Sequence, residues 1–327
     1  MSGGCSSCGP TSTPSRTGDE DAVAGYAAYI SRKVRDQGLR HFDRTAIARV
    51  VEHAARLAED QDRLSTRLPE IADLVAESSH RGLLRIDVSG TAIGQVNGLA
   101  ITGLGDHQFG HPVRVTATVA PGDGKLVDID REAELSGPTH DKGFLILAGL
   151  LRHLYCRDIP LALRASLVLE QSYGPIEGDS ASSAELFALL SALARVPIDQ
   201  QIGLTGSIDQ HGRIQAIGAV NDKIEGFFAT CRDRGLTGHQ GVIIPAANTR
   251  HLMLSHDVVD AVRDDTFHIW AITTADEGIE LLTGMIAGAA GPDGSYPEGT
   301  FHGRAQARIT AFAELARERN RPAASLG

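Results

Sequence analysis

The stretch that decides the fold begins at Leu161-Ala-Leu-Arg-Ala-Ser-Leu-Val-Leu169 and runs on to Ala194. Apolar residues occupy every second position of its first part, which is the period of a half-buried β-strand. A loop over residues 171–179 follows, and residues 184–194 then predict a helix that ends before Pro197. A strand, a loop and a helix in this order indicate a domain that mixes both kinds of element.

Strands and helices alternate on both sides of this stretch. Upstream, alternating apolar residues predict a strand over 113–119 and another over 126–129. Downstream, residues 201–208 and 213–217 predict a hairpin with its turn at His211-Gly212. A helix is expected over 220–234, ending at Gly235, and another over 274–282, ending before Gly284. Strands are expected over 241–244 and 267–272. We therefore predict an α+β fold with α/β-like alternation, because the hairpin interrupts a purely parallel sheet.

The N-terminal part has a different pattern. Residues 1–18 are rich in Gly, Ser, Thr and Pro and predict a disordered lead. Residues 19–80 predict a small helical domain, since apolar residues recur there at helical spacing, at 47, 50, 51, 54, 57 and 58 and again at 71, 74 and 75. From Arg81 onward the pattern changes to strands and turns, which predicts the start of a second, larger domain.

Composition restricts the class of protein. The chain has 327 residues, which favours two domains, and a net charge of −10 with 42% hydrophobic and 22% charged residues. This acidic balance argues against a general nucleic-acid-binding surface. The longest uncharged apolar stretches, 143–151 and 281–292, are too short to span a membrane. The first twenty residues lack the apolar core of a secretory signal, so we expect a cytoplasmic protein.

The cysteines and histidines do not predict a metal site. Cys5-x-x-Cys8 would need a second pair to complete a zinc site, and Cys156 and Cys231 are isolated. The motif His-Glu-x-x-His is absent from the sequence. We therefore expect the pair at 5 and 8 to be inert, and we expect neither a metal nor a cofactor.

The segment Glu177-Gly-Asp-Ser-Ala-Ser-Ser-Ala-Glu185 joins the predicted strand to the predicted helix. Ser182-x-x-Glu185 has the pattern of a capping box, which places the helix start there and Ser180 beside it. Free N–H groups at a helix N-terminus would stabilise the oxyanion that forms during acyl transfer. The alternative is that Ser180 is only a second capping residue.

Lys223 is a candidate general base. It lies beside an apolar stripe in the helix that begins at Val220, so its amine should be drawn toward the interior. A desolvated lysine has a lowered pKa and can accept a proton. Only four of the 31 Lys and Arg residues are lysines, which makes a lysine on a half-buried face harder to explain as an ordinary surface charge. The alternative is a lysine whose aliphatic chain covers apolar surface.

Five segments resemble the proteolytic domain of Lon proteases in their order and spacing: Gln171-Ser-Tyr-Gly-Pro-Ile-Glu-Gly-Asp-Ser-Ala-Ser182, Leu204-Thr-Gly-Ser-Ile208, Gly212-Arg-Ile-Gln-Ala-Ile-Gly218, Asn221-Asp-Lys-Ile224 and Val242-Ile-Ile-Pro-Ala-Ala-Asn248. The version around Ser180 is similar to the archaeal-type and ATP-independent branches. The resemblance covers about 81–321, and residues 20–80 resemble the helical lid of the ATPase module that precedes this domain in those branches.

The resemblance implies a Ser–Lys dyad in which Ser180 is the nucleophile and Lys223 the general base. Ser182 is the competing serine, but the 43 positions between Ser180 and Lys223 agree with the spacing expected for the family. Thr205 matches a threonine whose hydroxyl holds the lysine amine.

Three further residues are carried over from the family pattern. Glu177 matches an acidic position just before the nucleophile, and Gly178 and Asp179 match a tight loop whose backbone can approach substrate. His140-Asp-Lys-Gly143 also resembles a segment of the archaeal-type branch, and we interpret it as a structural turn.

The resemblance implies a serine endopeptidase that hydrolyses unfolded proteins or peptides through an acyl-enzyme and assembles into homohexamers. The sequence contains no Gly-x-x-x-x-Gly-Lys-[Ser/Thr] motif, because Gly122-Asp-Gly-Lys125 lacks the spacing and is followed by Leu126. A stand-alone peptidase and a fragment of a longer ATP-dependent enzyme both remain open. Two other readings are a non-catalytic Lon-like scaffold or binding module and a Ser–Lys esterase or amidase acting on small molecules.

Overall fold

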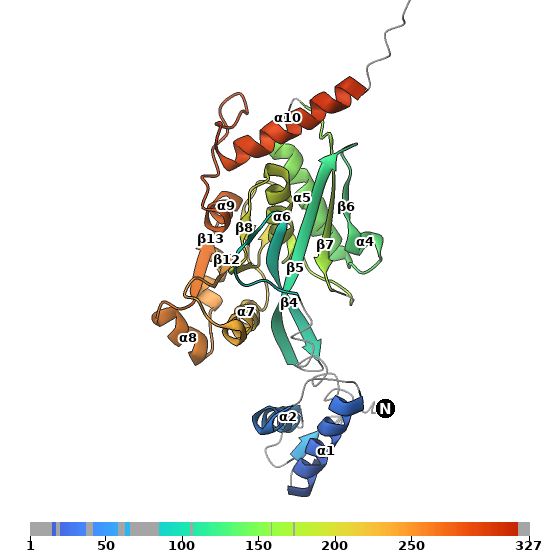
Figure 1. Ribbon diagram of the computed structural model, residues 1–327, viewed down its shortest axis with the longest axis vertical. Helices are drawn as coiled ribbons and strands as arrows, with labels where there is room; N and C mark the ends of the chain where they lie inside the picture. Colours follow the sequence, from blue (N-terminus) through green and yellow to red (C-terminus); the bar gives the residue numbers. More distant parts are fainter. Residues whose placement is uncertain are drawn as a thin grey trace, which may run out of the picture. The chain divides into compact units, whose positions relative to one another are not determined.

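The computed structural model describes residues 15–17, 20–36, 42–57, 63–65, 85–104, 107–157, 159–172 and 174–319 (Figure 1). The chain divides into two compact units. The first comprises residues 1–85 with 103–108, and the second comprises 86–102 with 109–327.

The first unit contains two helices, α1 (Glu20–Asp36) and α2 (Arg44–Leu57), and a small ladder in which β1 (Ser15–Thr17) pairs antiparallel with β2 (Arg63–Ser65). Four apolar residues of α1 recur at every fourth position, so they form one stripe that packs against α2. The buried core of this unit is Ala22, Tyr26, Ile30, Val34, Val50 and Ala54. The predicted lead of residues 1–18 lies outside the described residues except for β1, and so does the apolar repeat at 71–75.

A seven-stranded mixed sheet forms the centre of the second unit. Its strands, in spatial order, are β13 (His268–Ile272), β12 (Gly241–Pro245), β9 (Ile202–Leu204), β4 (Gln95–Leu104), β5 (His107–Pro121), β7 (Leu163–Glu170) and β6 (Leu126–Asp128). The ladders from β13 to β4 are parallel, β5 pairs antiparallel with β7, and β6 pairs parallel with β7. Two short antiparallel ladders lie outside this sheet, β3 (Thr91–Ala92) with β8 (Ile198–Asp199) and β10 (Ser207–Ile208) with β11 (Ile214–Gln215).

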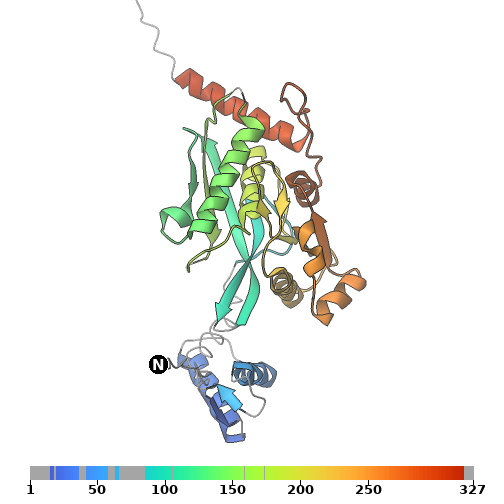
Figure 2. The ribbon, with the colours of Figure 1, turned by 180° about the vertical axis from the view of Figure 1, so that it is seen from behind.

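Helices complete the second unit: α4 (Ile129–Glu132), α5 (Pro138–Tyr155), α6 (Ser182–Ala194), α7 (Val220–Arg234), the 3-10 helix η1 (Ala246–His251), α8 (His256–Arg263), α9 (Ala275–Thr283) and α10 (Phe301–Arg319). Figure 2 shows α5 and α6 against one face of the sheet. Within the part of the chain that the structure describes, no helix has both the length and the apolar character needed to cross a bilayer.

The register of the sheet puts α6 and α7 on opposite faces. Gly98 of β4 pairs with Leu204 of β9, so these two residues point to the same face. Gly98 lies against Ala184 of α6, whereas Gly203, the neighbour of Leu204, lies against the ring of Phe227 in α7. Adjacent residues of a strand point to opposite faces, and β9 therefore lies between the two helices.

The α+β prediction is confirmed, and most expected elements appear within a few residues of their predicted limits. The predicted hairpin is wrong in its first strand. β9 belongs to the central sheet between β12 and β4, and only β10 and β11 form a hairpin. The expectation of a turn at His140 is also wrong, because this residue lies in the first turn of α5.

Candidate active site

The loop between β7 and α6 carries Ser180 to the start of α6. The helix begins at Ser182, and Ala181 at its N-cap makes no side-chain capping bond. The predicted capping box is therefore absent. Ser182 Oγ instead accepts a hydrogen bond from Ile208 N at 3.2 Å, and the carboxylate of Glu185 lies in the interior, 3.3 Å from His140 Nε2. Tertiary partners thus take both side chains away from the cap.

The first N–H groups of α6 are also occupied. Ser182 N donates to Asp179 O at 3.0 Å, and Ser183 N donates to Gly206 O at 3.1 Å. The expectation that these N–H groups are free to meet an oxyanion is wrong for both residues.

Helix α7 carries Lys223 in its first turn. The stripe predicted from the sequence is buried, and it consists of Val220, Ile224, Phe227, Phe228 and Cys231. Lys223 itself is only 3% exposed, so it lies deeper than a residue at the edge of the stripe would. The helix therefore delivers an ammonium group into the interior instead of to solvent.

Ser180, Lys223 and Thr205 meet in space. Lys223 Nζ donates to Ser180 Oγ at 2.8 Å and to Thr205 Oγ1 at 3.2 Å. Thr205 Oγ1 in turn donates to Ser180 O at 3.2 Å, and Gly206 N donates to the same carbonyl at 3.0 Å. Residues from the loop before α6, from the end of β9 and from α7 thus hold one another in a single hydrogen-bonded group.

Burial changes the protonation of this group. It lowers the pKa of Lys223 to about 8 from the ordinary value of 10.5, and the nearby carboxylate of Asp179 opposes part of that effect. A lysine with a pKa near neutrality has a substantial fraction of neutral amine, which can accept a proton. The arrangement can therefore activate the half-buried hydroxyl of Ser180.

The other predicted residues surround the group without joining it. Asp179 Oδ2 accepts a hydrogen bond from Ser207 Oγ at 2.8 Å. Glu177 is exposed and accepts from Thr139 N at 3.3 Å, and hydrogen bonding by Thr139, mainly through its side chain, lowers the pKa of the Glu177 carboxyl. Gly178 has φ +90°, a backbone conformation that favours glycine and permits the tight loop.

Two family models match the sequence. Residues 168–283 match the Lon protease (S16) C-terminal proteolytic domain, and residues 41–82 match the AAA+ ATPase LID domain of archaeal LonB. The first match includes the whole hydrogen-bonded group described above. By this match, residues 168–283 resemble the proteolytic domain of the Lon protease family.

Similar proteins support this assignment. A protein of Escherichia coli (strain K12) named "Putative Lon protease homolog" is 47% identical over 203 residues, which is 62% of this chain and 35% of that protein. A protein of the same name from Haemophilus influenzae is 45% identical over 201 residues, 61% of this chain and 33% of its own length. The archaeal Lon protease of Pyrococcus abyssi is 26% identical over 303 residues, 77% of this chain and 28% of that protein. The chain spans about a third of the length of these relatives.

Two glycines of this Lon-type domain support Lys223 from behind, and the sequence analysis did not identify them. A Cβ atom at Gly110 of β5 would overlap the backbone of Asp222 and Lys223, and one at Gly226 of α7 would overlap the backbone of Gly110 and His111. The strand and the helix therefore approach so closely that only glycine is accommodated. An isolated glycine in a strand or a helix can indicate a close approach of another backbone, but the sequence does not show which backbone that is.

Gly206 and Ser207 are two more residues that touch the site without having been predicted. Both lie in the Leu204-Thr-Gly-Ser-Ile208 segment, where only Thr205 received a role. Gly206 donates to Ser180 O, and Ser207 donates to Asp179. The segment thus holds the serine and its neighbour from the side of β9.

Among the described residues, one group of His and carboxylate side chains is close enough to hold a metal ion: Asp128, His140 and Glu185. None of these residues belongs to the hydrogen-bonded group around Ser180. The sequence analysis predicted no metal in this domain, and it assigned no role to His140.

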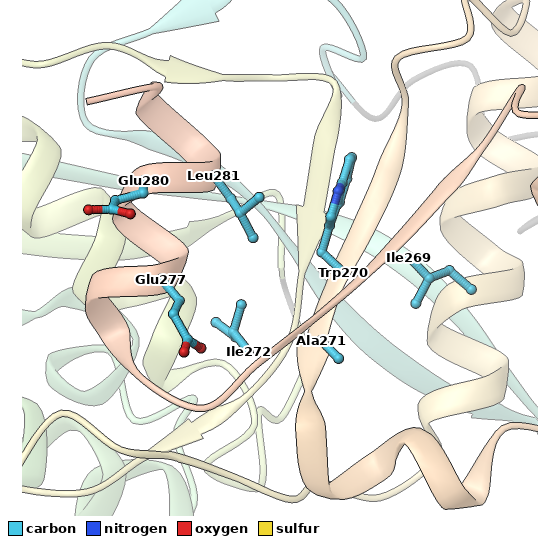
Figure 3. A pocket seen from close by; sticks show the side chains of 7 residues that line it. All are labelled: Ile269, Trp270, Ala271, Ile272, Glu277, Glu280 and Leu281. Carbon is cyan, nitrogen blue, oxygen red and sulfur yellow. The ribbon is translucent and has the colours of Figure 1, made fainter. Parts of the chain in front are cut away.

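A separate hollow of about 560 Å³ lies between β13 and α9 of the Lon-type domain (Figure 3). Trp270 and Leu281 line it together with Glu277 and Glu280. Both carboxylates already have structural roles, because Glu277 completes a capping box with Thr274 and Glu280 accepts from Ala287 N at 3.0 Å. The hollow therefore offers apolar surface at the edge of the sheet and no reactive group.

Proposed function

We propose that this domain hydrolyses peptide bonds in unfolded proteins, with Ser180 as the nucleophile and Lys223 as the general base. The observation that carries the proposal is the 2.8 Å separation of Lys223 Nζ and Ser180 Oγ at a lysine that is almost fully buried. A scaffold that only binds a partner has no need for a desolvated lysine at this distance from a serine.

Proton transfer follows from the geometry. In the protonated state Nζ donates to Ser180 Oγ, and after loss of a proton the same contact lets the serine hydroxyl donate to the amine lone pair. Attack of Oγ on a peptide carbonyl carbon then passes the hydroxyl proton to Lys223. The ammonium returns that proton to the leaving amine, and the acyl group remains on Ser180.

Deacylation repeats the cycle with water. Neutral Lys223 takes a proton from the water that attacks the acyl carbonyl. The bond between the acyl carbon and Ser180 Oγ then breaks, and Lys223 returns the proton to Oγ. Thr205 Oγ1 accepts from Nζ throughout, which keeps the amine directed at the serine. Ser182 N and Ser183 N are already bonded to Asp179 O and Gly206 O, so neither donates to the oxyanion in this proposal.

The wider context belongs to the same proposal. We infer a lid-like domain over 19–80 and a proteolytic domain over 81–321, supported by the family matches at 41–82 and 168–283. We also infer assembly into homohexamers, which is the arrangement that the family resemblance implies. Size-exclusion chromatography with light scattering measures the assembly directly.

The test is hydrolysis of casein and of a short fluorogenic peptide, each with and without ATP. Ser180→Ala and Lys223→Arg should both abolish cleavage, because the first removes the nucleophile and the second keeps the charge but cannot act as a base. Lys142→Arg is the matched control, since the same substitution is made at an exposed lysine and should leave the rate unchanged. Full activity in either dyad variant would contradict the assignment.

The two substrates separate the remaining alternatives. Cleavage of casein without ATP supports a self-sufficient peptidase, whereas cleavage of the peptide alone supports a domain that depends on a motor. A folded protein that cleaves neither substrate would favour the scaffold. Rapid hydrolysis of a small ester without cleavage of peptides would favour the esterase.

A further inference from the structure

Three buried ionisable side chains converge where three elements meet. Asp128 is the last residue of β6, His140 lies in the first turn of α5, and Glu185 lies in the first turn of α6. Their exposed fractions are 3%, 2% and 1%. Groups of this kind are almost never buried unless they are paired or hold a metal.

The separations of these atoms match a metal site. His140 Nε2 lies 3.2 Å from Asp128 Oδ2 and 3.3 Å from Glu185 Oε1, and all three atoms lie within 4.8 Å of one another. A tetrahedral zinc ion with bonds of about 2.0–2.1 Å separates its ligand atoms by about 3.3–3.4 Å. The separations of the imidazole nitrogen from each carboxylate oxygen therefore match those of such a site.

None of these three atoms meets the geometry of a hydrogen bond with another described residue, although His140 Nε2 lies within ion-pair distance of both carboxylates. The other oxygen of Asp128 accepts from Asp130 N at 3.0 Å as the cap of α4, which fixes the orientation of the carboxylate and directs Oδ2 at His140. Buried polar atoms without well-formed hydrogen bonds are costly, and a bound cation would remove that cost.

The balance of charge also favours a cation. A third carboxylate, Asp130, is buried beside the group, where it accepts from Leu169 N at 2.8 Å. A divalent cation offsets two negative charges where a proton on His140 offsets one.

We propose that Asp128, His140 and Glu185 form a zinc site that ties β6 and α5 to the first turn of α6. Zinc accepts both imidazole and carboxylate ligands and completes a site of three protein ligands with water. Mg²⁺ is the weaker candidate, because it requires near-octahedral geometry and gives up its waters reluctantly.

This zinc site supports the loop that carries Ser180. Glu185 lies one turn into the helix that this loop enters, and Gly143 of α5 packs directly against Asp179 and Ser182. Fixing the start of α5 to the start of α6 therefore restrains the loop from two sides. His140 and Glu185 are positioning residues in this role, since the metal acts on the loop and not on substrate. Zinc binding itself does not rest on the proposed peptidase function.

The experiment measures zinc in protein that carries no polyhistidine tag. Cys5→Ser with Cys8→Ser provides the background, because this pair could bind zinc independently. The protein is treated with a chelator, incubated with excess Zn²⁺, separated from free metal and analysed by mass spectrometry. We expect about one zinc ion per parent chain. In Glu185→Gln we expect the affinity for zinc to be at least about tenfold lower.

A matched control and a second readout decide the outcome. His302→Gln alters another buried histidine that contacts a carboxylate, 3.0 Å from Asp276, and should retain the zinc. Zinc should raise the thermal midpoint of the parent chain but not that of Glu185→Gln, and Co²⁺ should give the visible absorption of a tetrahedral complex. Absence of bound zinc in the folded parent chain would overturn the proposal, as would equal zinc content in Glu185→Gln or equally tight binding of Mg²⁺.

Discussion

The lowered pKa of Lys223 predicts the pH dependence of the proposed peptidase. Only neutral lysine can accept the proton of Ser180, so kcat/KM should follow the fraction of neutral amine. With a pKa of about 8, that fraction is about 9% at pH 7 and about 91% at pH 9. The expected rise is therefore about tenfold between these two values, with a plateau above pH 9.

An ordinary lysine would behave differently. With a pKa of 10.5 the neutral fraction at pH 7 falls about 300-fold below the value expected here, and kcat/KM would rise about 100-fold from pH 7 to pH 9 without a plateau. The assay is hydrolysis of a fluorogenic peptide under kcat/KM conditions from pH 6 to pH 10.5, with folding checked by circular dichroism at each pH. A midpoint near 10 or an absent plateau would refute the reasoning.

Asp179→Asn tests the electrostatic cause. The Asp179 carboxylate raises the pKa of Lys223, so its neutralisation should move the midpoint of the profile to lower pH. Asp222→Asn is the matched control, because it neutralises the carboxylate next to Lys223 in sequence and should leave the midpoint near that of the parent. A shift to higher pH in Asp179→Asn would contradict the electrostatic account.

Stability gives a check that does not require activity. The pKa of Lys223 is lower in the folded than in the unfolded state, so the unfolded state binds more protons between about pH 8 and 10.5. The cost of the buried lysine, on the order of 3 kcal/mol, is present below pH 8 and disappears as the pH rises through this window. Lys223→Met should lose this dependence, measured by urea unfolding at pH 7.5 and pH 10.5. Parallel curves for both proteins would argue against a lowered pKa.

Two further substitutions test the packing around the site. Gly226→Ala should displace α7 from β5, since its methyl group would overlap the backbone of Gly110, and we expect at least tenfold lower kcat/KM. Gly218→Ala is its control, because the added methyl group meets nothing within 4 Å, and an equal loss there would contradict the packing argument.

Ser182→Ala should lower the free energy of unfolding by about 1 kcal/mol, because the hydrogen bond from Ile208 N is lost. Peptidase activity should be retained, and an inactive variant would make Ser182 the nucleophile.

The sequence predicts elements best where the apolar pattern is local. The helix from Val220 to Arg234 appears with its predicted limits and its predicted buried stripe. Both the helical spacing of its apolar residues and the glycine that ends it, Gly235, can be read from neighbouring residues of the sequence. The hairpin prediction was wrong in its first strand for the opposite reason. β9 is a central strand whose partners, β4 and β12, lie far away in the chain, and three apolar residues do not indicate which strands they pair with.

Local motifs also mislead when tertiary partners compete for the same side chains. Ser182 and Glu185 have the spacing of a capping box, but Ser182 bonds to Ile208 N and Glu185 lies beside His140. His140 was interpreted as part of a turn, because a lone histidine has no periodic signal. Its neighbours Asp128 and Glu185 come from other elements, so the group exists only in the folded chain.

The sequence alone determined the α+β class, the order of the elements and, through the family resemblance, the choice of Ser180 and Lys223 as the residues to examine. Their 43-residue separation contains no information about the distance between Oγ and Nζ. That distance depends on β9, which lies between α6 and α7. It also depends on Gly110 and Gly226, which let β5 approach the backbone of α7 at Lys223. Desolvation of the lysine is likewise a property of packing, because the residues that contact Lys223 include Gly110, Ser180 and Thr205, which are distant from it in sequence.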